Sequence, residues 1–269
     1  MMIFRRLFDF YINASIHVAL AVAALAYITV WELHLDTSPY LFLFVFFGAI
    51  TGYNFVKYSK LAGMHHRSLA HSLRNIQIFS FLSFGIVIFC IFNLPVKVLW
   101  ITAIFGVFTF LYSAPFFRQK NLRSLSGFKI FVVALVWAGV TVSVPLAMTE
   151  LTLTLDIALT FLQRFLFVIV LTLPFEIRDL QYDLANLQTL PQRLGVQKTK
   201  FLGIFFLVLS VSLERFKDLF NETHFLSFAT VCLLAGLALM VSGKKQSGYF
   251  ASFWVESIPI VWMLFSLFL

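Results

Sequence analysis

Long apolar runs separated by short polar segments are the dominant pattern of this chain. Each run is expected to form a helix, because about 20 predominantly apolar residues are enough for a helix to cross the hydrocarbon layer of a membrane. The runs cover residues 12–30, 40–56, 76–92, 98–113, 128–148, 157–175, 201–213, 224–241 and 249–269. The seventh run is short, and an amphipathic continuation would take it through Phe216 and Leu219. The pattern predicts an all-α bundle of about nine transmembrane helices, in one domain over residues 1–269.

Composition supports a membrane protein. Hydrophobic residues make up 61% of the 269 and charged residues only 12%, whereas soluble domains carry about 25% charged residues. Both cysteines, Cys90 and Cys232, lie inside apolar runs, so no disulfide framework is indicated and packing roles are expected. We therefore predict an integral multi-pass protein, located in the inner or plasma membrane if the source is bacterial, with lipids as its surroundings.

The cations are distributed unevenly between the two ends of the expected helices. With the N-terminus in the cytoplasm, nine helices place the C-terminus outside and almost all of the 20 Lys and Arg residues inside. The exceptions are Lys97, Arg164, Arg215 and Lys217. This asymmetry follows the positive-inside rule, so the net charge of +8 is explained by topology. A nucleic-acid partner is not expected, because the basic residues flank apolar runs and form no soluble basic face.

Acidic residues cluster at only one place, directly after the sixth run. Glu176, Asp179 and Asp183 stand at positions i, i+3 and i+7, which fall within an arc of roughly 60° on a helix. Carboxylate oxygens on one face suit Mg²⁺, which takes one or two carboxylates together with substrate phosphates. The alternative is an acidic cap at the membrane surface without a chemical role.

This segment resembles the second aspartate-rich motif of the UbiA superfamily of intramembrane prenyltransferases. The family pattern DxxDxxxD, followed by TLP and LG, is matched here by Glu176-x-x-Asp179-x-x-x-Asp183, Thr189-Leu-Pro191 and Leu194-Gly195. Tyr112-Ser113-Ala-Pro115 and the basic residues Arg118, Lys120 and Arg123 resemble two further family features. The resemblance implies transfer of a prenyl group from a polyprenyl diphosphate to an aromatic or lipid acceptor, with Mg²⁺ held by Glu176, Asp179 and Asp183.

The other aspartate-rich motif of the family is degenerate here. Aligned on Asn54, the family's three acids are replaced by Phe, Tyr and Ala, and Lys57 stands one turn after the asparagine. Three interpretations remain open. Lys57 could neutralise a diphosphate in place of metal charge, it could form a salt bridge with Asp179 or Asp183 in an inactive descendant, or it could be a lysine that extends to the membrane surface.

Two classes of function follow from the resemblance. In the first, an enzyme binds the prenyl diphosphate through Asn54, Lys57, Tyr112, Arg118 and Lys120, between Phe-rich helices that hold its hydrocarbon tail. In the second, the chain is an inactive membrane scaffold that binds lipids or a protein partner. Glu256, near the start of the last run, is expected to pair helices or to belong to a polar path. His65, His66 and His71 lack a nearby Cys or acid and are expected in an exposed loop, without a metal.

Overall fold

The computed structural model describes residues 2–58, 70–113, 127–150, 152–181, 188–218 and 220–268. These residues form helices and connecting turns, with no strand in the described part of the chain. The α-helices are α1 (Met2–Asn13), α2 (Ile16–Glu32), α3 (Pro39–Tyr58), α4 (Ala70–Ile91), α5 (Val96–Ser113), α6 (Lys129–Ala138), α7 (Val144–Leu146), α8 (Leu155–Asp179), α9 (Leu190–Leu194), α10 (Val196–Leu213), α11 (Glu222–Val241) and α12 (Ile258–Phe268). The prediction of an all-α fold is confirmed.

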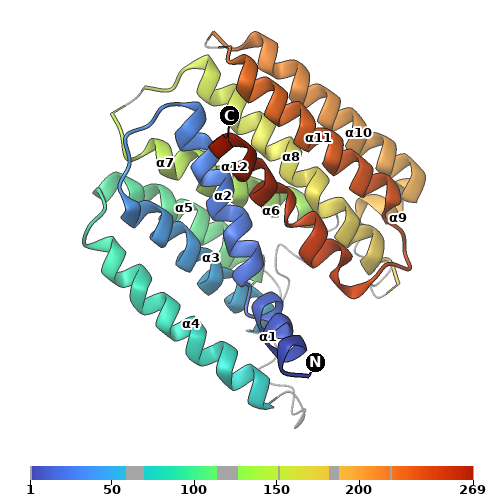
Figure 1. The fold of residues 1–269 in the computed structure, drawn as a ribbon, viewed down its shortest axis with the longest axis horizontal. Coiled ribbons are helices and arrows are strands. Elements are labelled where there is room, and N and C mark those ends of the chain that lie inside the picture. The colour runs from blue at the N-terminus through green and yellow to red at the C-terminus, as the bar shows by residue number, and fades with distance from the viewer. Residues whose placement is uncertain are drawn as a thin grey trace.

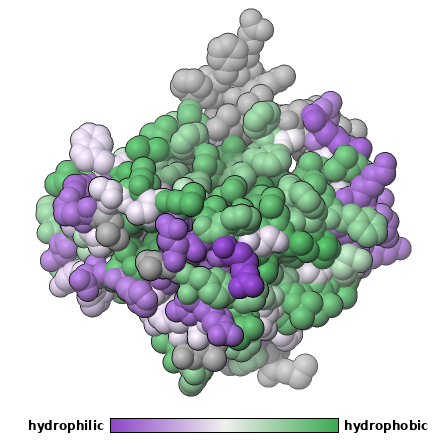
Figure 2. All heavy atoms as spheres, turned by 90° about the horizontal axis from the view of Figure 1, so that it is seen from above, coloured by the Kyte–Doolittle hydropathy of each residue, from purple (hydrophilic) through white to green (hydrophobic). Residues whose placement is uncertain are grey.

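The helices have the lengths and surfaces expected of membrane spans. In the described residues, eight helical segments are long and apolar enough to cross a membrane, and the pair α1–α2, bent by 54°, would make a ninth. Large hydrophobic side chains face outward, among them Phe81 on α4, Trp100 on α5 and Phe205 on α10, and hydrophobic residues cover much of the face in Figure 2. Soluble monomers rarely expose apolar surface on this scale. The protein is an integral multi-pass membrane protein, and the sidedness of its termini stays a prediction.

Helix α8 is the central element of the bundle. It packs against α6, α10 and α11 and runs between α4 at one edge and α10 and α11 at the other (Figure 1). Phe167, Ile169 and Leu173 of α8 are almost completely buried, as are Phe228 and Leu239 of α11. Because α8 crosses the core from one end to the other, the polar residues near its two ends mark two separate polar regions.

The first expected helix, residues 12–30, proves to be two helices. The chain breaks after Asn13, and Ser15 has φ 62°, in the left-handed region. A residue other than glycine adopts this conformation only where its surroundings fix it. Ser15 Oγ donates a hydrogen bond to Asn54 Oδ1 at 2.8 Å and accepts one from Lys57 Nζ at 2.9 Å. The break depends on these distant residues of α3, which explains why an apolar pattern alone gave one continuous helix.

Two π-helical turns precede prolines inside spans. The turn η3 (Gly139–Ser143) lies before Pro145, and η6 (Phe250–Val255) lies before Pro259. Proline has no N–H to donate, and a local π turn is one way in which a membrane helix accommodates the change. The fifth expected helix therefore tolerates Pro145 as predicted. The seventh, α10, continues as a 3₁₀ turn, η5 (Glu214–Phe216), and Leu219 lies outside the described residues.

Candidate functional site

A large cavity opens between α3, α5, α6 and α8. Its volume is about 640 Å³, which is within the range of small-molecule sites. Apolar side chains such as Phe44, Phe105 and Val136 form most of its wall. Gly48 and Gly52 of α3 also line it, and a Cβ atom added at either glycine would meet no atom within 4 Å. The absence of side chains at these positions therefore widens the apolar part of the cavity.

Charged residues line the same cavity near one set of helix ends. They are Lys129 at the start of α6, Glu176 and Asp179 at the end of α8, and Glu256 directly after η6. Lys129 Nζ lies 2.7 Å from Glu176 Oε1, and the Glu176 side chain is only 2% exposed. A buried carboxylate is stable only with a partner. Lys129, which sequence reasoning counted only as a topological cation, is therefore part of the site.

The acidic motif is only partly described. Helix α8 extends beyond the expected end at residue 175, but it stops at Asp179. Glu176 and Asp179 lie on this helix, and Leu180 and Gln181 form a turn after it. Asp179 Oδ1 accepts a hydrogen bond from Arg178 Nε at 2.8 Å, and its side chain is partly exposed. The third acid, Asp183, lies outside the described residues.

The segment after the acids is explained by local structure. Thr189 caps the short helix α9 through a capping box with Gln192, whose Oε1 accepts a hydrogen bond from the Thr189 N–H at 3.1 Å. Such reciprocal bonds satisfy the free N–H groups of a helix start. Pro191 stands in the first turn, and Gly195 has φ 79°, which favours glycine. The TLP and LG residues therefore form a short capped helix and the turn that leads into α10.

The other predicted substrate contacts fall into three groups. Tyr112 is buried and lines the cavity, which fits its predicted role. Asn54 and Lys57 are not part of the cavity wall. Asn54 is buried, and its Nδ2 donates to Ala14 O and Ser80 Oγ. Arg118 and Lys120 lie outside the described residues, as do His65 and His66.

The structure also bears on the three interpretations of Lys57. Its ammonium donates to Ser15 Oγ at 2.9 Å, and it forms no ion pair with Asp179 among the described residues. It therefore helps to hold the break between α1 and α2. Its charge still acts on Glu256, which lines the cavity. Lys57 thus lies behind the cavity wall, and its contact with a diphosphate, one of the three interpretations, stays a prediction.

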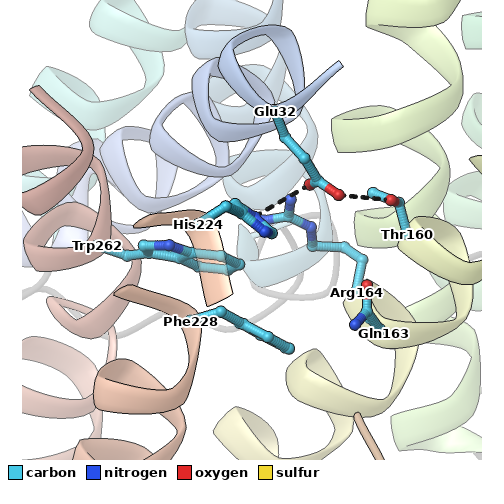
Figure 3. A pocket seen from close by; sticks show the side chains of 7 residues that line it. All are labelled: Glu32, Thr160, Gln163, Arg164, His224, Phe228 and Trp262. Carbon is cyan, nitrogen blue, oxygen red and sulfur yellow. Dashed lines mark hydrogen bonds and ion pairs between the residues drawn. The ribbon is translucent and has the colours of Figure 1, made fainter. Parts of the chain in front are cut away.

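A second cluster of polar side chains lies at the opposite ends of the helices. Lys217 Nζ lies 2.5 Å from Glu32 Oε1 and 2.7 Å from Glu214 Oε2. His224 Nδ1 lies 2.9 Å from Glu214 Oε1, and Thr160 Oγ1 donates to Glu32 Oε1 at 2.7 Å. Figure 3 shows Glu32 reaching toward Thr160 and His224 beside Arg164. Sequence reasoning did not predict this ion network, because its members come from four separate segments.

Lys217 neutralises the carboxylates of the ion network from within the protein. Glu32, Glu214 and His224 are close enough to share a metal ion, but the ammonium of Lys217 already contacts both carboxylates. The Arg164 guanidinium lies 5.0 Å from the Trp262 ring, and its Nη1 has no hydrogen-bond partner. The adjoining space, about 10 Å³, is enough for about one water molecule. The ion network therefore has the character of a stabilising core element, and the cavity is the stronger candidate site.

Comparisons with known proteins identify the fold. No protein-family model and no curated protein matches the sequence. A UbiA homologue from Archaeoglobus fulgidus matches with a TM-score of 0.68 and 13% identity, over 96% of this chain and 98% of that chain. The same homologue bound to GPP and Mg²⁺ matches with a TM-score of 0.67 and 12% identity, over 96% and 98%.

A third structure comes from work on digeranylgeranylglyceryl phosphate synthase. It matches with a TM-score of 0.57 and 17% identity, over 98% of this chain and 96% of that chain. At identities this low, the matches show similarity of fold alone, and that similarity covers nearly the whole chain. The expected likeness to UbiA proteins is confirmed at the level of the fold, and the motif in residues 176–195 stays a prediction. The chain is a multi-pass membrane protein with the fold of the UbiA superfamily.

Proposed function

We propose that this protein transfers a prenyl group from a prenyl diphosphate to a small aromatic or lipid acceptor. The observation that carries the proposal is one cavity whose wide apolar part adjoins charged residues at the helix ends. A prenyl diphosphate has a matching division between hydrocarbon tail and anionic end, and ligand sites combine apolar walls with a few polar groups in this way. Structures of the Archaeoglobus fulgidus homologue with GPP or DMAPP and Mg²⁺ support the same ligand class.

The charges suggest how the ligand would lie. The diphosphate would face Lys129 in the cavity wall, and the Arg178 cation would add positive charge from behind the wall, beside Asp179. The hydrocarbon tail would extend along Gly48 and Gly52, where the wall has no side chains. Arg118 and Lys120 stay predicted contacts of the diphosphate. In this arrangement the anionic end is at the helix ends and the tail is inside the bundle.

Mg²⁺ fits this end of the cavity through its oxygen donors. Asp179 is a partly exposed carboxylate in the wall, and with Asp183 it would supply the hard oxygen ligands that Mg²⁺ prefers. Glu176 is already neutralised by Lys129, so we assign it a supporting role in orienting Lys129. When bound, Mg²⁺ would supply positive charge that stabilises the diphosphate as a leaving group.

The residues of the wall would support the organic part of the reaction. The carbon–oxygen bond breaks, its electron pair leaves with the diphosphate, and an allylic cation remains. Tyr53 and Trp137 present aromatic rings to the cavity, and Trp137 Nε1 donates to Tyr53 Oη at 2.5 Å. Aromatic faces attract a cation through their quadrupole. The acceptor then forms the new bond to carbon and loses a proton.

Ligand protection and product formation test the proposal together. Purified protein would be heated with GPP in the presence of Mg²⁺ or EDTA, because a ligand that binds only the folded state raises its stability. Radiolabelled GPP and a membrane lipid extract would then be used to detect labelled product. Asp179→Asn should remove Mg²⁺-dependent protection and product, whereas Asp36→Asn, which changes an exposed acid outside the cavity, should keep both.

A non-catalytic role is the second candidate. The ion pair between Lys129 and Glu176, the first acid of the acidic motif, favours a site that is partly neutralised without metal. A scaffold of this kind would be protected by GPP equally well with Mg²⁺ or EDTA, and no diphosphate would be released with any chain length. That result would replace the transferase proposal with a lipid-binding or partner-binding subunit.

A further inference from the structure

Glu256 is the acid in the cavity wall that the acidic motif does not include. It lies directly after the π turn η6, half-buried, with its side chain in the wall of the cavity. No hydrogen bond or ion pair joins its carboxylate to another described residue. An acid within a membrane protein that lacks a partner is costly and usually functional. The residue therefore requires an explanation other than helix pairing, which was one of its two expected roles.

The backbone at Glu256 is specialised to place this side chain. The Glu256 N–H bonds to Ala251 O, five residues back, whereas the next N–H, of Ser257, bonds to Phe253 O, four residues back. A single π turn inserts one residue into the helical repeat, and such turns occur frequently at functional sites. The insertion changes the direction of Glu256 relative to the face of α12 that follows.

The position of Glu256 differs from that of the other two cavity acids. Among the described residues, Glu176, Asp179 and Glu256 do not gather into a group with ligand atoms within 4.8 Å of one another. Glu176 has Lys129 and Asp179 has Arg178 as close partners. A third ligand for the same metal ion is thus not the role that this geometry favours for Glu256.

The charges around Glu256 are positive. Lys57 at the end of α3 and Arg178 near the end of α8 act on its carboxylate. Neither lies in the cavity wall, so the cavity side of the carboxylate is left for a ligand. Burial opposes the charged form of this carboxyl group, and the two cations favour it. A carboxyl group that faces a cavity and has no hydrogen-bond donor of its own is suited to exchange a proton with a ligand.

We propose that Glu256 is the catalytic base that accepts the proton lost by the acceptor. The inference rests on the proposed prenyl transfer. As the acceptor's nucleophilic atom forms its bond to the allylic carbon, its proton passes to the Glu256 carboxylate, and the diphosphate leaves with the electron pair of the broken bond. The proton then passes to water at the open end of the cavity, and the carboxylate is regenerated. The acceptor is therefore a hydroxyl compound or an activated aromatic ring that carries a proton to lose.

Glu256→Gln is the decisive variant, because an amide of the same shape can bind the acceptor but cannot take its proton. Glu222→Gln makes the same chemical change at an exposed position of α11, outside the cavity wall. Three quantities would be measured with radiolabelled GPP: thermal protection with Mg²⁺, diphosphate release without acceptor, and labelled product with membrane lipid extract. A positioned base commonly contributes on the order of 100-fold or more to the rate.

We expect Glu256→Gln to lose labelled product by roughly 100-fold or more while it keeps GPP protection and acceptor-independent diphosphate release. Glu256→Asp should recover part of the product rate. Unchanged product formation in Glu256→Gln would overturn the assignment and leave the transferase proposal intact. Loss of GPP protection together with product would show a role in substrate binding and would also overturn it. Absence of product and of GPP protection in the wild type would refute the proposed function itself.

Discussion

Replacing Lys217 by Met should destabilise the protein strongly. The Lys217 side chain is only 3% exposed, and its ammonium contacts Glu32 and Glu214, whose side chains are 8% and 1% exposed. Methionine keeps the length and apolar character of the stem but removes the charge. Two carboxylates would then remain in the core without the cation that contacts both, which is the situation in which breaking a buried ion pair is most costly.

The magnitude follows from what remains around the two acids. Loss of one partner from a buried pair costs about 3–5 kcal/mol. His224 still contacts both carboxylates, and the charge of Arg164 still acts on Glu32. These groups compensate part of the loss, so we expect a value near the lower limit, about 3 kcal/mol. For a chain of this size, that corresponds to a fall in Tm of roughly 6–12 °C.

Lys97→Met is the matched control. Lys97 also pairs with an acid, Glu150, but the two side chains are 57% and 88% exposed. Exposed pairs contribute between about 0 and 1 kcal/mol. The free energy of unfolding would be measured in mixed micelles by tryptophan fluorescence, with Trp31 and Trp262 beside the ion network as local reporters. Equal stabilities of the two variants would refute the reasoning that burial determines the contribution of each pair.

Four other perturbations address the cavity, the helix packing, the helix break and the topology. Gly52→Phe should keep the fold, because a Cβ there meets open space, but it should abolish thermal protection by long prenyl diphosphates before protection by short ones. In Gly203→Ala, the new Cβ would lie 2.4 Å from Leu239, so this variant should instead lower the free energy of unfolding by about 1–3 kcal/mol. Asn54→Ala should cost about 2–3 kcal/mol in a chemical denaturation series, since three hydrogen bonds of a buried amide are lost. A reporter fused after Leu269 should lie outside and one at Lys245 inside, and detection of both on the same side would contradict the nine-span topology.

The membrane fold could be predicted from the sequence because each span depends only on residues that are neighbours along the chain. Each span needs only a run of apolar residues of sufficient length, and the expected ranges match the observed helices closely except at residues 12–30. The Ser15 break depends on Asn54 and Lys57 of another helix, so no local pattern could reveal it. Cys90 and Cys232 are buried and unpaired, in agreement with the packing roles expected for them.

The candidate site was only partly predictable for the same reason. Glu176 and Asp179 were found because they stand close together in sequence, and both line the cavity. Lys129 is far from Glu176 in sequence and resembles any other cation at a membrane surface, yet the two atoms of their ion pair are 2.7 Å apart. Glu256 was noted as an isolated acid, and only the fold placed it in the same cavity. Pairings across a bundle depend on helix packing, which residue spacing within one run does not specify.

The two polar regions of α8 differ in a way that separates stability from function. At the N-terminal end, Glu32, Glu214 and Lys217 satisfy one another within hydrogen-bond distance, so a ligand could bind there only by displacing an internal partner. At the other end, about 18 Å along the helix from Arg164 to Glu176, Glu256 faces a 640 Å³ cavity without such a partner. Carboxylates that are paired with an internal cation contribute to stability and have little charge left to offer a ligand, whereas an unsatisfied acid costs stability until a ligand engages it. The cavity end is therefore where substrate recognition and proton transfer can be coupled.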